Sequence, residues 1–382
     1  MTAATSTLVV PPGLRGVVVT DTAIGDVRGE EGRYHYRQYD AVRLAEARSF
    51  EDVWFLLREG RLPDGAEQAA FAATVARARR LDPALAVPLA AIAEAGGPLL
   101  DQLRSALSVA GARRGCRPLL DVDDETARDD TLALTALVPT LAAALYRLGR
   151  DQEPVVAGPS LGTVAAYLHN ITGEDPGPGT VRALEQYLIA TIDHGFNAST
   201  FTARVVASTG ADVAACLVAG LAALSGPLHG GAPSRALELL DEVGDPARAG
   251  EAAAAMLERG ERLMGFGHAV YRTDDPRSRL LHQVAAALGA ERLVAAEQVE
   301  AAVLAALRRA KPDQRLATNV EFYAGVVLEA IGLPAELFTA TFAVSRAVGW
   351  SAHLLEQRGE GRIVRPAARY IGPEPFADVP SV

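Results

Sequence analysis

The sequence predicts a mostly α-helical protein of two domains with a short hairpin near its N-terminus. Apolar residues recur with the 3.6-residue period of a helix along most of the 382 residues. Nowhere do short apolar strands alternate with helices, as a parallel sheet would require. Within residues 13–40, however, polar and apolar positions alternate, which favours a hairpin. Two domains are expected because a chain of this length exceeds one comfortable core.

Helices follow one another from Ser49 onward. Ser49 is a good N-cap for a helix that Gly60 and Pro63 end. Alanine-rich amphipathic runs, separated by Pro, Gly or Asp turns, predict further helices at 66–80, 87–95, 99–112, 124–149 and 160–172.

The second half of the chain is also helical. Gly173–Gly179 is a loop of prolines and glycines, and Thr180 is the expected cap of a helix that runs out at His194-Gly195. Beyond it the pattern predicts helices at 197–208, 211–224, 233–243, 247–262, 275–288, 292–309, 319–331 and 334–357. The tail 362–372 alternates apolar and polar residues, and the last ten residues are expected to fray.

Composition excludes several classes of protein. The apolar content of 49% is ordinary for a globular chain, so disorder is expected only at the ends. A net charge of -10 argues against a nucleic-acid surface. Cys116 and Cys216 lie far apart, which fits a reduced, cytoplasmic protein. Met1–Pro12 lacks the charge pattern of a signal peptide, and no uncharged apolar run reaches membrane-spanning length.

The segment Met264–Arg277 combines features of a binding site. Two glycines bracket Phe266 and let a ligand approach the main chain, and His268 follows at once. Arg277 adds a planar cation that suits a carboxylate. The pairing indicates acid–base work on a small carboxylic acid. The plainer interpretation is a glycine turn before a helix capped by Asp275.

Two other turns carry a histidine. His229 lies in Gly226–Ala232, which interrupts a helical pattern and would bring the imidazole close to a ligand. The alternative is a helix–helix corner with an incidental histidine. His194 precedes Gly195 at the end of its helix and either binds a ligand or caps helix carbonyls.

Three charged residues complete the candidates. Glu321 follows the natural cap Asn319 and is either a general base or a carboxylate that favours the helix dipole. Arg346 interrupts an apolar helix, where it either pairs at the surface or faces a cleft. Arg365 lies in an extended segment, where it is either a ligand-binding residue or only a surface cation.

A metal site built from the three histidines and the glutamate is the other chemical alternative. None of these residues has the i, i+4 spacing of helical ligands, and each lies in its own turn, so no metal is expected.

Together these segments resemble the citrate synthase family nearly from end to end. The resemblance rests on segments that fall in the family's order, namely Gly13–Gly16 with Thr22–Ile24, Tyr36–Asp40, Asp193–Thr200, Gly226–Ala232, Gly265–Arg277, Asn319–Gly325, Phe342–Gln357 and Arg365–Pro366. Any one of these segments is weak evidence for the family. Chance would rarely place all of them in the same order and at the same spacing. The Asn-Val-Glu-Phe variant and Leu120–Asp124 most resemble the second, actinobacterial-type citrate synthases.

The resemblance implies a fold and an activity. It implies an α-helical homodimer with a large domain of residues 1–230 plus 332–382 and a small domain of residues 231–331 that closes over the site. Members condense acetyl-CoA with oxaloacetate and water to give citrate and CoA through an enolate and citryl-CoA. Acetyl-CoA is a substrate there, and no cofactor, nucleic acid or membrane is implied.

Carried over position by position, the resemblance also implies roles. Glu321 would remove a proton from the acetyl methyl group, His229 would donate a hydrogen bond to the enolate oxygen, and His268 would polarise and protonate the ketone of oxaloacetate. The residues implied for binding oxaloacetate are His194, Arg277, Arg346 and Arg365 of a second subunit. Those implied for binding CoA are Arg272, Arg315, Gly265, Phe266 and Gly267.

The family usually has aspartate where Glu321 stands. The extra methylene adds about 1.3 to 1.5 Å of reach, in a reaction where an error near 1 Å costs ~10²-fold. Either the backbone compensates or activity is low. Three alternatives therefore stand beside citrate synthase: a 2-methylcitrate synthase using propionyl-CoA, a low-activity relative that binds oxaloacetate and CoA, and a helical scaffold without a small-molecule site.

Overall fold

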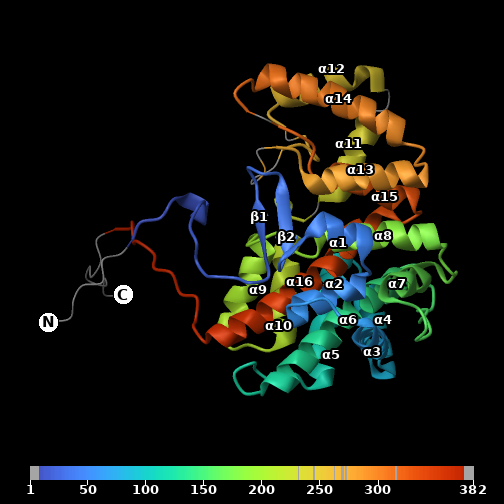
Figure 1. Cartoon of the computed structure of the whole chain (residues 1–382), viewed down its shortest axis with the longest axis vertical. Helices are drawn as coiled ribbons and strands as arrows, with labels where there is room; N and C mark the ends of the chain where they lie inside the picture. Colours follow the sequence, from blue (N-terminus) through green and yellow to red (C-terminus); the bar gives the residue numbers. More distant parts are fainter. Residues whose placement is uncertain are drawn as a thin grey trace, which may run out of the picture.

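The structure is mostly α-helical, which confirms the predicted fold class (Figure 1). The computed structural model describes residues 8–230, 232–243, 246–261, 263–267, 271, 273–314 and 316–373. Most of the predicted frayed C-terminus lies outside these residues.

The predicted hairpin is present and is the main strand element of the described chain. Strands β1 (Gly25–Arg28) and β2 (Arg33–Tyr36) pair antiparallel, with Gly25 opposite Tyr36, and a two-residue strand β3 (Tyr39–Asp40) pairs with β2. Asp40 then caps helix α1 (Ala41–Ala47), which the sequence did not predict. Only seven residues long, α1 is too short for a clear 3.6-residue pattern.

Some helices of the first half begin at a capping side chain. Ser49 and Asp52 form the two bonds of a capping box at the start of α2. The helices in this half are α2 (Phe50–Glu59), α3 (Gly65–Ala78), α4 (Ala86–Ala95), α5 (Leu99–Arg114), α6 (Asp124–Leu148), α7 (Thr163–Thr172) and α8 (Pro178–Thr191). The prediction that Thr180 caps α8 is wrong. The helix begins earlier because Pro178, with its fixed φ, occupies its first position.

The second half keeps the predicted order. It contains α9 (Ala198–Ser208), α10 (Val213–Leu224), α11 (Ala232–Val243), α12 (Ala249–Glu258), α13 (Pro276–Leu288), α14 (Leu293–Ala310), α15 (Val320–Ala330) and α16 (Phe338–Glu360). Short 3₁₀ turns occur at Pro12–Leu14, Pro83–Leu85, Pro246–Arg248 and Ala335–Leu337. The tail that alternates apolar and polar residues is irregular and mostly exposed.

Helices α6 and α16 form the centre of the larger group of helices. Both are buried along most of their length, as expected of helices that are apolar on nearly every side. By length and composition α6 is apolar enough to span a membrane, but 78% of its most apolar window is buried inside the structure, as in a core helix. Arg346 lies on this buried helix and is 2% exposed.

The helices gather into two groups (Figure 1). Helices α11 to α15 lie together at one end, and α1 to α10 with α16 lie at the other. The N-terminal and C-terminal segments leave the larger group on the same side and project away from it. The division into a large domain of residues 1–230 plus 332–382 and a small domain of residues 231–331 stays a prediction, as does its closure over a ligand.

Candidate active site

A cleft of about 1730 Å³ lies between the two groups of helices. Residues of both groups line it, including His194, His229 and Arg346 from one and Arg277 and Glu321 from the other. The tertiary fold thus brings together side chains that lie more than a hundred residues apart.

The hairpin fixes the chain just before His194. The hydroxyl of Tyr34 donates to the carbonyl of Ala190 at 3.0 Å, and the hydroxyl of Tyr36 donates to the carbonyl of Asp193 at 3.1 Å. These bonds tie the end of α8 to β2. The Nε2 atom of His194 lies 3.0 Å from the hydroxyl of Tyr271, so the imidazole is held from the other side of the cleft as well.

His229 is held as a neutral hydrogen-bond donor. The backbone N–H of Ser199, in the first turn of α9, donates to Nε2 of His229 at 3.2 Å. Because Nε2 accepts, the ring proton is assigned to Nδ1. Burial, reinforced by the charge of Arg346, lowers the pKa of His229 to about 4. At neutral pH the imidazole is uncharged, and its Nδ1–H is the group that can donate.

Glu321 lies in the first turn of α15, directly after the cap. The side chain of Asn319 accepts from the backbone N–H of Glu321 at 3.0 Å, as predicted for an N-cap. Burial raises the pKa of Glu321 to about 7; the charge of Arg277 opposes this shift and that of Asp275 adds to it. A carboxylate that is half ionised near neutral pH is suited to act as a general base.

Arg277 is a buried cation with a buried counter-ion. Its Nε and Nη2 atoms donate to the two oxygens of Asp275 at 3.0 and 2.8 Å, and both residues are at most 3% exposed. Burial works against the charge of Arg277, but Asp275 outweighs it and raises the pKa of Arg277. The guanidinium is therefore permanently charged where it lines the cleft.

Arg346 is the second buried cation that lines the cleft. Its Nε donates to the carbonyl of Thr191 at 3.1 Å, and the residue is 2% exposed. Within the described part of the chain, no carboxylate oxygen lies within 4.0 Å of this guanidinium. Burial lowers the pKa of Arg346 to about 10, with Asp193 opposing the shift and Arg277 adding to it. A charged group in this position favours an anionic ligand.

The glycine segment before His268 forms one wall of the cleft. Gly267 N–H donates to the carbonyl of Ala317 at 2.8 Å, and Asn319 N–H donates to the carbonyl of Gly265 at 2.9 Å. Gly265 and Gly267 have φ values of +85° and +81°, which side chains rarely adopt. The turn therefore needs glycine, and it is paired with the strand-like residues that lead into α15.

Not every predicted site residue can be placed in the cleft. His194, His229, Gly265, Phe266, Gly267, Arg277, Glu321 and Arg346 line it. His268, Arg272 and Arg315 lie outside the described residues. Arg365 is exposed on the C-terminal segment and is absent from the described lining of the cleft.

Some lining and supporting residues escaped the sequence interpretation. Lys311 lines the cleft. The sequence could have indicated it, because it is the only lysine of an acidic chain. Ser199 and Tyr271 act through contacts with distant residues and gave no local signal. The segment Gly158–Gly162 matches the Gly-x-Ser-x-Gly pattern of serine hydrolases. A nucleophile elbow lies between a strand and a helix, whereas this segment follows an irregular stretch and is not part of the cleft lining.

The arrangement suits one kind of chemistry. A carboxylate with a pKa of about 7 shares a cleft with a neutral imidazole donor, which is the pairing needed to remove a proton beside a carbonyl group. Two buried arginines favour a small substrate with carboxylate groups. Among the described residues, no group of His, Cys, Asp or Glu is placed to hold a metal ion.

Known proteins resemble this chain along almost its whole length. A family model described as "Citrate synthase, C-terminal domain" matches residues 13–367. The chain is 41% identical over 369 residues to "Putative citrate synthase 2" of Mycobacterium tuberculosis, which covers 95% of this chain and 93% of that protein. It is 38% identical over 367 residues to "2-methylcitrate synthase" of Mycobacterium tuberculosis, covering 95% and 90%.

A solved structure has the same fold. It is the ternary complex of citrate synthase from Thermoplasma acidophilum with carboxymethyl coenzyme A and oxaloacetate. Its TM-score with this chain is 0.87 at 28% identity, over 96% of this chain and 97% of that one.

Proposed function

The chain belongs to the citrate synthase family, and on that premise we propose that its cleft condenses acetyl-CoA with oxaloacetate and water to give citrate and CoA. Members of this family are acyltransferases, so the protein is an enzyme of that class. The observation that carries the proposal is the shared cleft, where the raised pKa of Glu321 and the neutral imidazole of His229 meet two buried arginines.

Proton abstraction is the first step. The Glu321 carboxylate takes a proton from the acetyl methyl group, and the electron pair of the C–H bond moves toward the thioester oxygen. A thioester methyl is a very weak acid, so the enolate forms only with a donor aimed at that oxygen. His229 supplies this donor through Nδ1, because Ser199 occupies Nε2. A neutral imidazole can stabilise the oxygen without first losing a proton to Glu321.

Carbon–carbon bond formation is the second step. The enolate carbon attacks the ketone carbon of oxaloacetate, and the ketone oxygen receives a proton. We assign that donation to His268, following the family's pattern. Arg277 and Arg346 bind the carboxylates of oxaloacetate, and His194 binds beside them. This assignment is supported by the burial of both arginines and by the absence, among the residues that the structure describes, of a carboxylate in contact with Arg346.

Hydrolysis completes the reaction. Water adds to the thioester carbonyl of citryl-CoA, the C–S bond breaks, and CoA leaves as its thiol. We place the CoA along Gly265, Phe266 and Gly267, with Arg272 and Arg315 as its phosphate contacts. A carboxymethyl coenzyme A bound by the Thermoplasma acidophilum relative supports CoA as the class of second substrate.

We further propose a cytoplasmic homodimer in which Arg365 completes the partner's site. Its support is the position of Arg365, exposed on a C-terminal segment that projects from the molecule (Figure 1). Apolar side chains on the two terminal segments are exposed too, including Val18, Ile363 and Ile371.

A thiol-release assay tests the proposed function. Mixing the protein with acetyl-CoA and oxaloacetate should release CoA thiol. Glu321→Gln should abolish the release while oxaloacetate still raises the melting temperature, because the arginines are intact. If Glu321→Gln stays fully active, Glu321 is not the base. Stabilisation by oxaloacetate with no thiol release from the unsubstituted protein would indicate a binding protein instead.

The Mycobacterium tuberculosis 2-methylcitrate synthase relative makes propionyl-CoA the alternative substrate. One methylene in an apolar pocket is worth only about 1 to 3 kcal/mol of discrimination. We expect the higher kcat/KM with acetyl-CoA. A clear preference for propionyl-CoA would assign the second function.

A further inference from the structure

The carboxylate of Asp275 lies where two parts of the proposed site meet. Asp275 caps α13 and is 1% exposed. It accepts hydrogen bonds from the backbone and side chain of Arg277, two residues ahead, and from the backbone of Val320, in another helix. A simple helix cap would need only the first of these contacts.

Its contact with Arg277 fixes the direction of the guanidinium. Oδ1 accepts from Nε at 3.0 Å and Oδ2 accepts from Nη2 at 2.8 Å, which is a two-point contact between planar groups. Because both planes are matched, the arginine cannot rotate without breaking both bonds. Asp275 thus determines which way Arg277 faces in the cleft.

Its contact with Val320 fixes the start of α15. Oδ2 of Asp275 accepts from the N–H of Val320 at 3.1 Å, 45 positions away in the sequence. Val320 is the first residue of the helix and Glu321 is the second. One carboxylate oxygen therefore touches both the guanidinium of Arg277 and the turn that carries Glu321.

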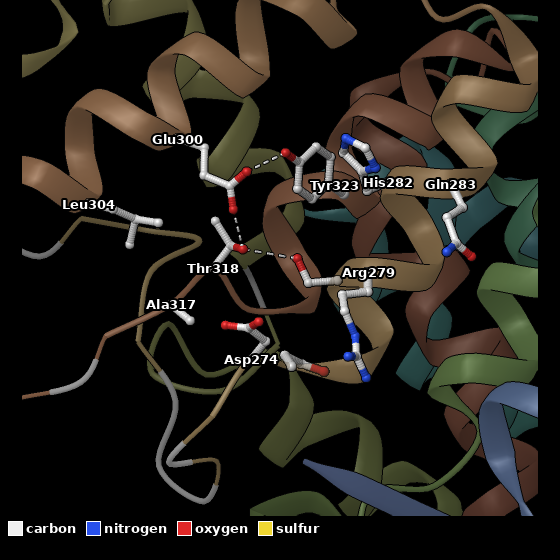
Figure 2. Close-up of a pocket in the computed structure, with 11 residues that line it drawn as sticks. Asp274, Arg279, His282, Gln283, Glu300, Leu304, Ala317, Thr318 and Tyr323 are labelled. Carbon is white, nitrogen blue, oxygen red and sulfur yellow. Dashed lines mark hydrogen bonds between the residues drawn. The ribbon is translucent and has the colours of Figure 1, made fainter.

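A second set of hydrogen bonds also supports the turn before α15. Its side chains line a smaller pocket of about 260 Å³, which Asp275 lines as well (Figure 2). Figure 2 shows Glu300 of α14 reaching Thr318 and Tyr323. The Thr318 hydroxyl donates to Glu300 at 2.6 Å and accepts from Ser278 of α13 at 3.2 Å. Thr318 directly precedes Asn319, the cap of α15, so the backbone before the helix is anchored independently of Asp275.

We infer that Asp275 is a positioning residue that holds Arg277 and Glu321 at a fixed separation, so that the bound carboxylic acid and the base meet in one geometry. The inference rests on the proposed function, in which Arg277 binds oxaloacetate and Glu321 removes the proton. Asp275 touches neither substrate; it acts through these two residues.

Two substitutions separate its two contacts. Asp275→Asn leaves one acceptor oxygen for the four N–H groups that now donate to the carboxylate, so the contacts with Arg277 and with Val320 both weaken. Val320→Pro removes the N–H that donates to Asp275 and replaces a buried side chain of the cleft lining with a smaller one, and proline is well tolerated at the first position of a helix. Asn319, with φ -99° and ψ 178°, has the extended backbone that a following proline requires. The control is Gly65→Pro, at the first position of α3, where no atom lies within 4 Å of an added Cβ.

Steady-state kinetics with varied oxaloacetate should distinguish the variants. Asp275→Asn should raise the KM for oxaloacetate ~10- to 10²-fold, as for the loss of a hydrogen bond between charged groups, and should lower kcat. Val320→Pro should lower kcat by at least ~10-fold through displacement of Glu321, with the KM for oxaloacetate unchanged. Gly65→Pro should leave both parameters unchanged.

The results that overturn the inference are equally specific. A folded Asp275→Asn protein with unchanged kcat and KM contradicts it. If Asp275→Asn does not fold, Val320→Pro decides: unchanged kcat, or a rise in KM together with a fall in kcat, contradicts the inference. Failure of the proposed function looks different, because the unsubstituted protein would then release no thiol, or Glu321→Gln would remain active.

Discussion

Glu321 combines a catalytic advantage with a cost in stability. Its pKa of about 7 lies above the ordinary value of 4.5, so the folded state binds this proton more tightly than the unfolded chain does. The stability of the fold therefore falls as pH rises from about 4.5 to about 7, and the whole cost is present above pH 7. By linkage the cost is about 3 kcal/mol.

Glu321→Gln should therefore stabilise the protein at alkaline pH. Glutamine keeps the shape but never ionises, so the melting temperature at pH 8 should rise above that of the unsubstituted protein, and the difference should vanish near pH 5. Calorimetry at both pH values measures this. The exposed Glu258→Gln on α12 is the control and should change the melting temperature by the same small amount at both. Equal effects of Glu321→Gln at pH 5 and pH 8 would contradict the raised pKa.

The length of the Glu321 side chain should matter as much as its charge. The start of α15 is held by Asn319, by the N–H of Val320 and by the pairing of Asn319 with Gly265. Such a backbone cannot move by a bond length to rescue a shorter acid. We expect Glu321→Asp to lower kcat ~10²-fold in the thiol-release assay without changing oxaloacetate binding. An undiminished kcat would show that the backbone adapts.

At the scale of elements, the site depends on the close approach of α16 to the end of α8. A Cβ added to Gly349 would lie 2.2 Å from the carbonyl oxygen of Ile192, which no side chain tolerates. Arg346, one turn earlier on α16, donates to Thr191, and His194 follows Ile192 by two residues. This contact thus sets the spacing between a buried cation and an imidazole of the cleft.

Gly349→Ala should push these two elements apart. We expect a loss of about 1 to 3 kcal/mol in the free energy of unfolding, as for overpacking, together with a higher KM for oxaloacetate. The matched control is Gly359→Ala on the same helix, where an added Cβ meets nothing within 4 Å. There alanine should stabilise the helix by about 1 kcal/mol. Urea unfolding measures both, and a neutral Gly349→Ala would disprove the close contact.

At the scale of the whole molecule, the proposed homodimer would divide the site between two copies of the chain. Arg365 is exposed on the C-terminal segment, while Glu321 lines the cleft. If Arg365 completes the partner's site, Arg365→Ala and Glu321→Gln should each be inactive alone. A heterodimer of the two holds one site with both residues intact.

Mixing the two inactive variants should therefore restore activity. Unfolding and refolding them together in equal amounts should give about a quarter of the unsubstituted activity, because half of the dimers are mixed and each has one complete site. Refolding each variant alone is the control. No recovery, despite a dimeric mass by light scattering, would place Arg365 outside the partner's site, and a monomeric mass would exclude the dimer.

The sequence alone determined several helix starts, the hairpin and the order of the helices, because these depend on residues close together along the chain. Ser49, Asp275 and Asn319 mark helix starts because a capping side chain satisfies amides of its own first turn. The hairpin and the order of the helices follow from periodicity alone. The same reasoning missed α1, which is too short to show a period, and misplaced the start of α8.

Residues that act through distant partners were beyond such reasoning. The sequence marked His229, Arg277 and Glu321 as chemically suggestive and left a plain interpretation open for each. Only the fold decides that Ser199 fixes the tautomer of His229 and that Asp275 joins Arg277 to the helix of Glu321. The physical reason is that a pKa or a hydrogen bond depends on atoms within a few ångströms in space, whereas the pattern of a sequence reports only neighbours along the chain.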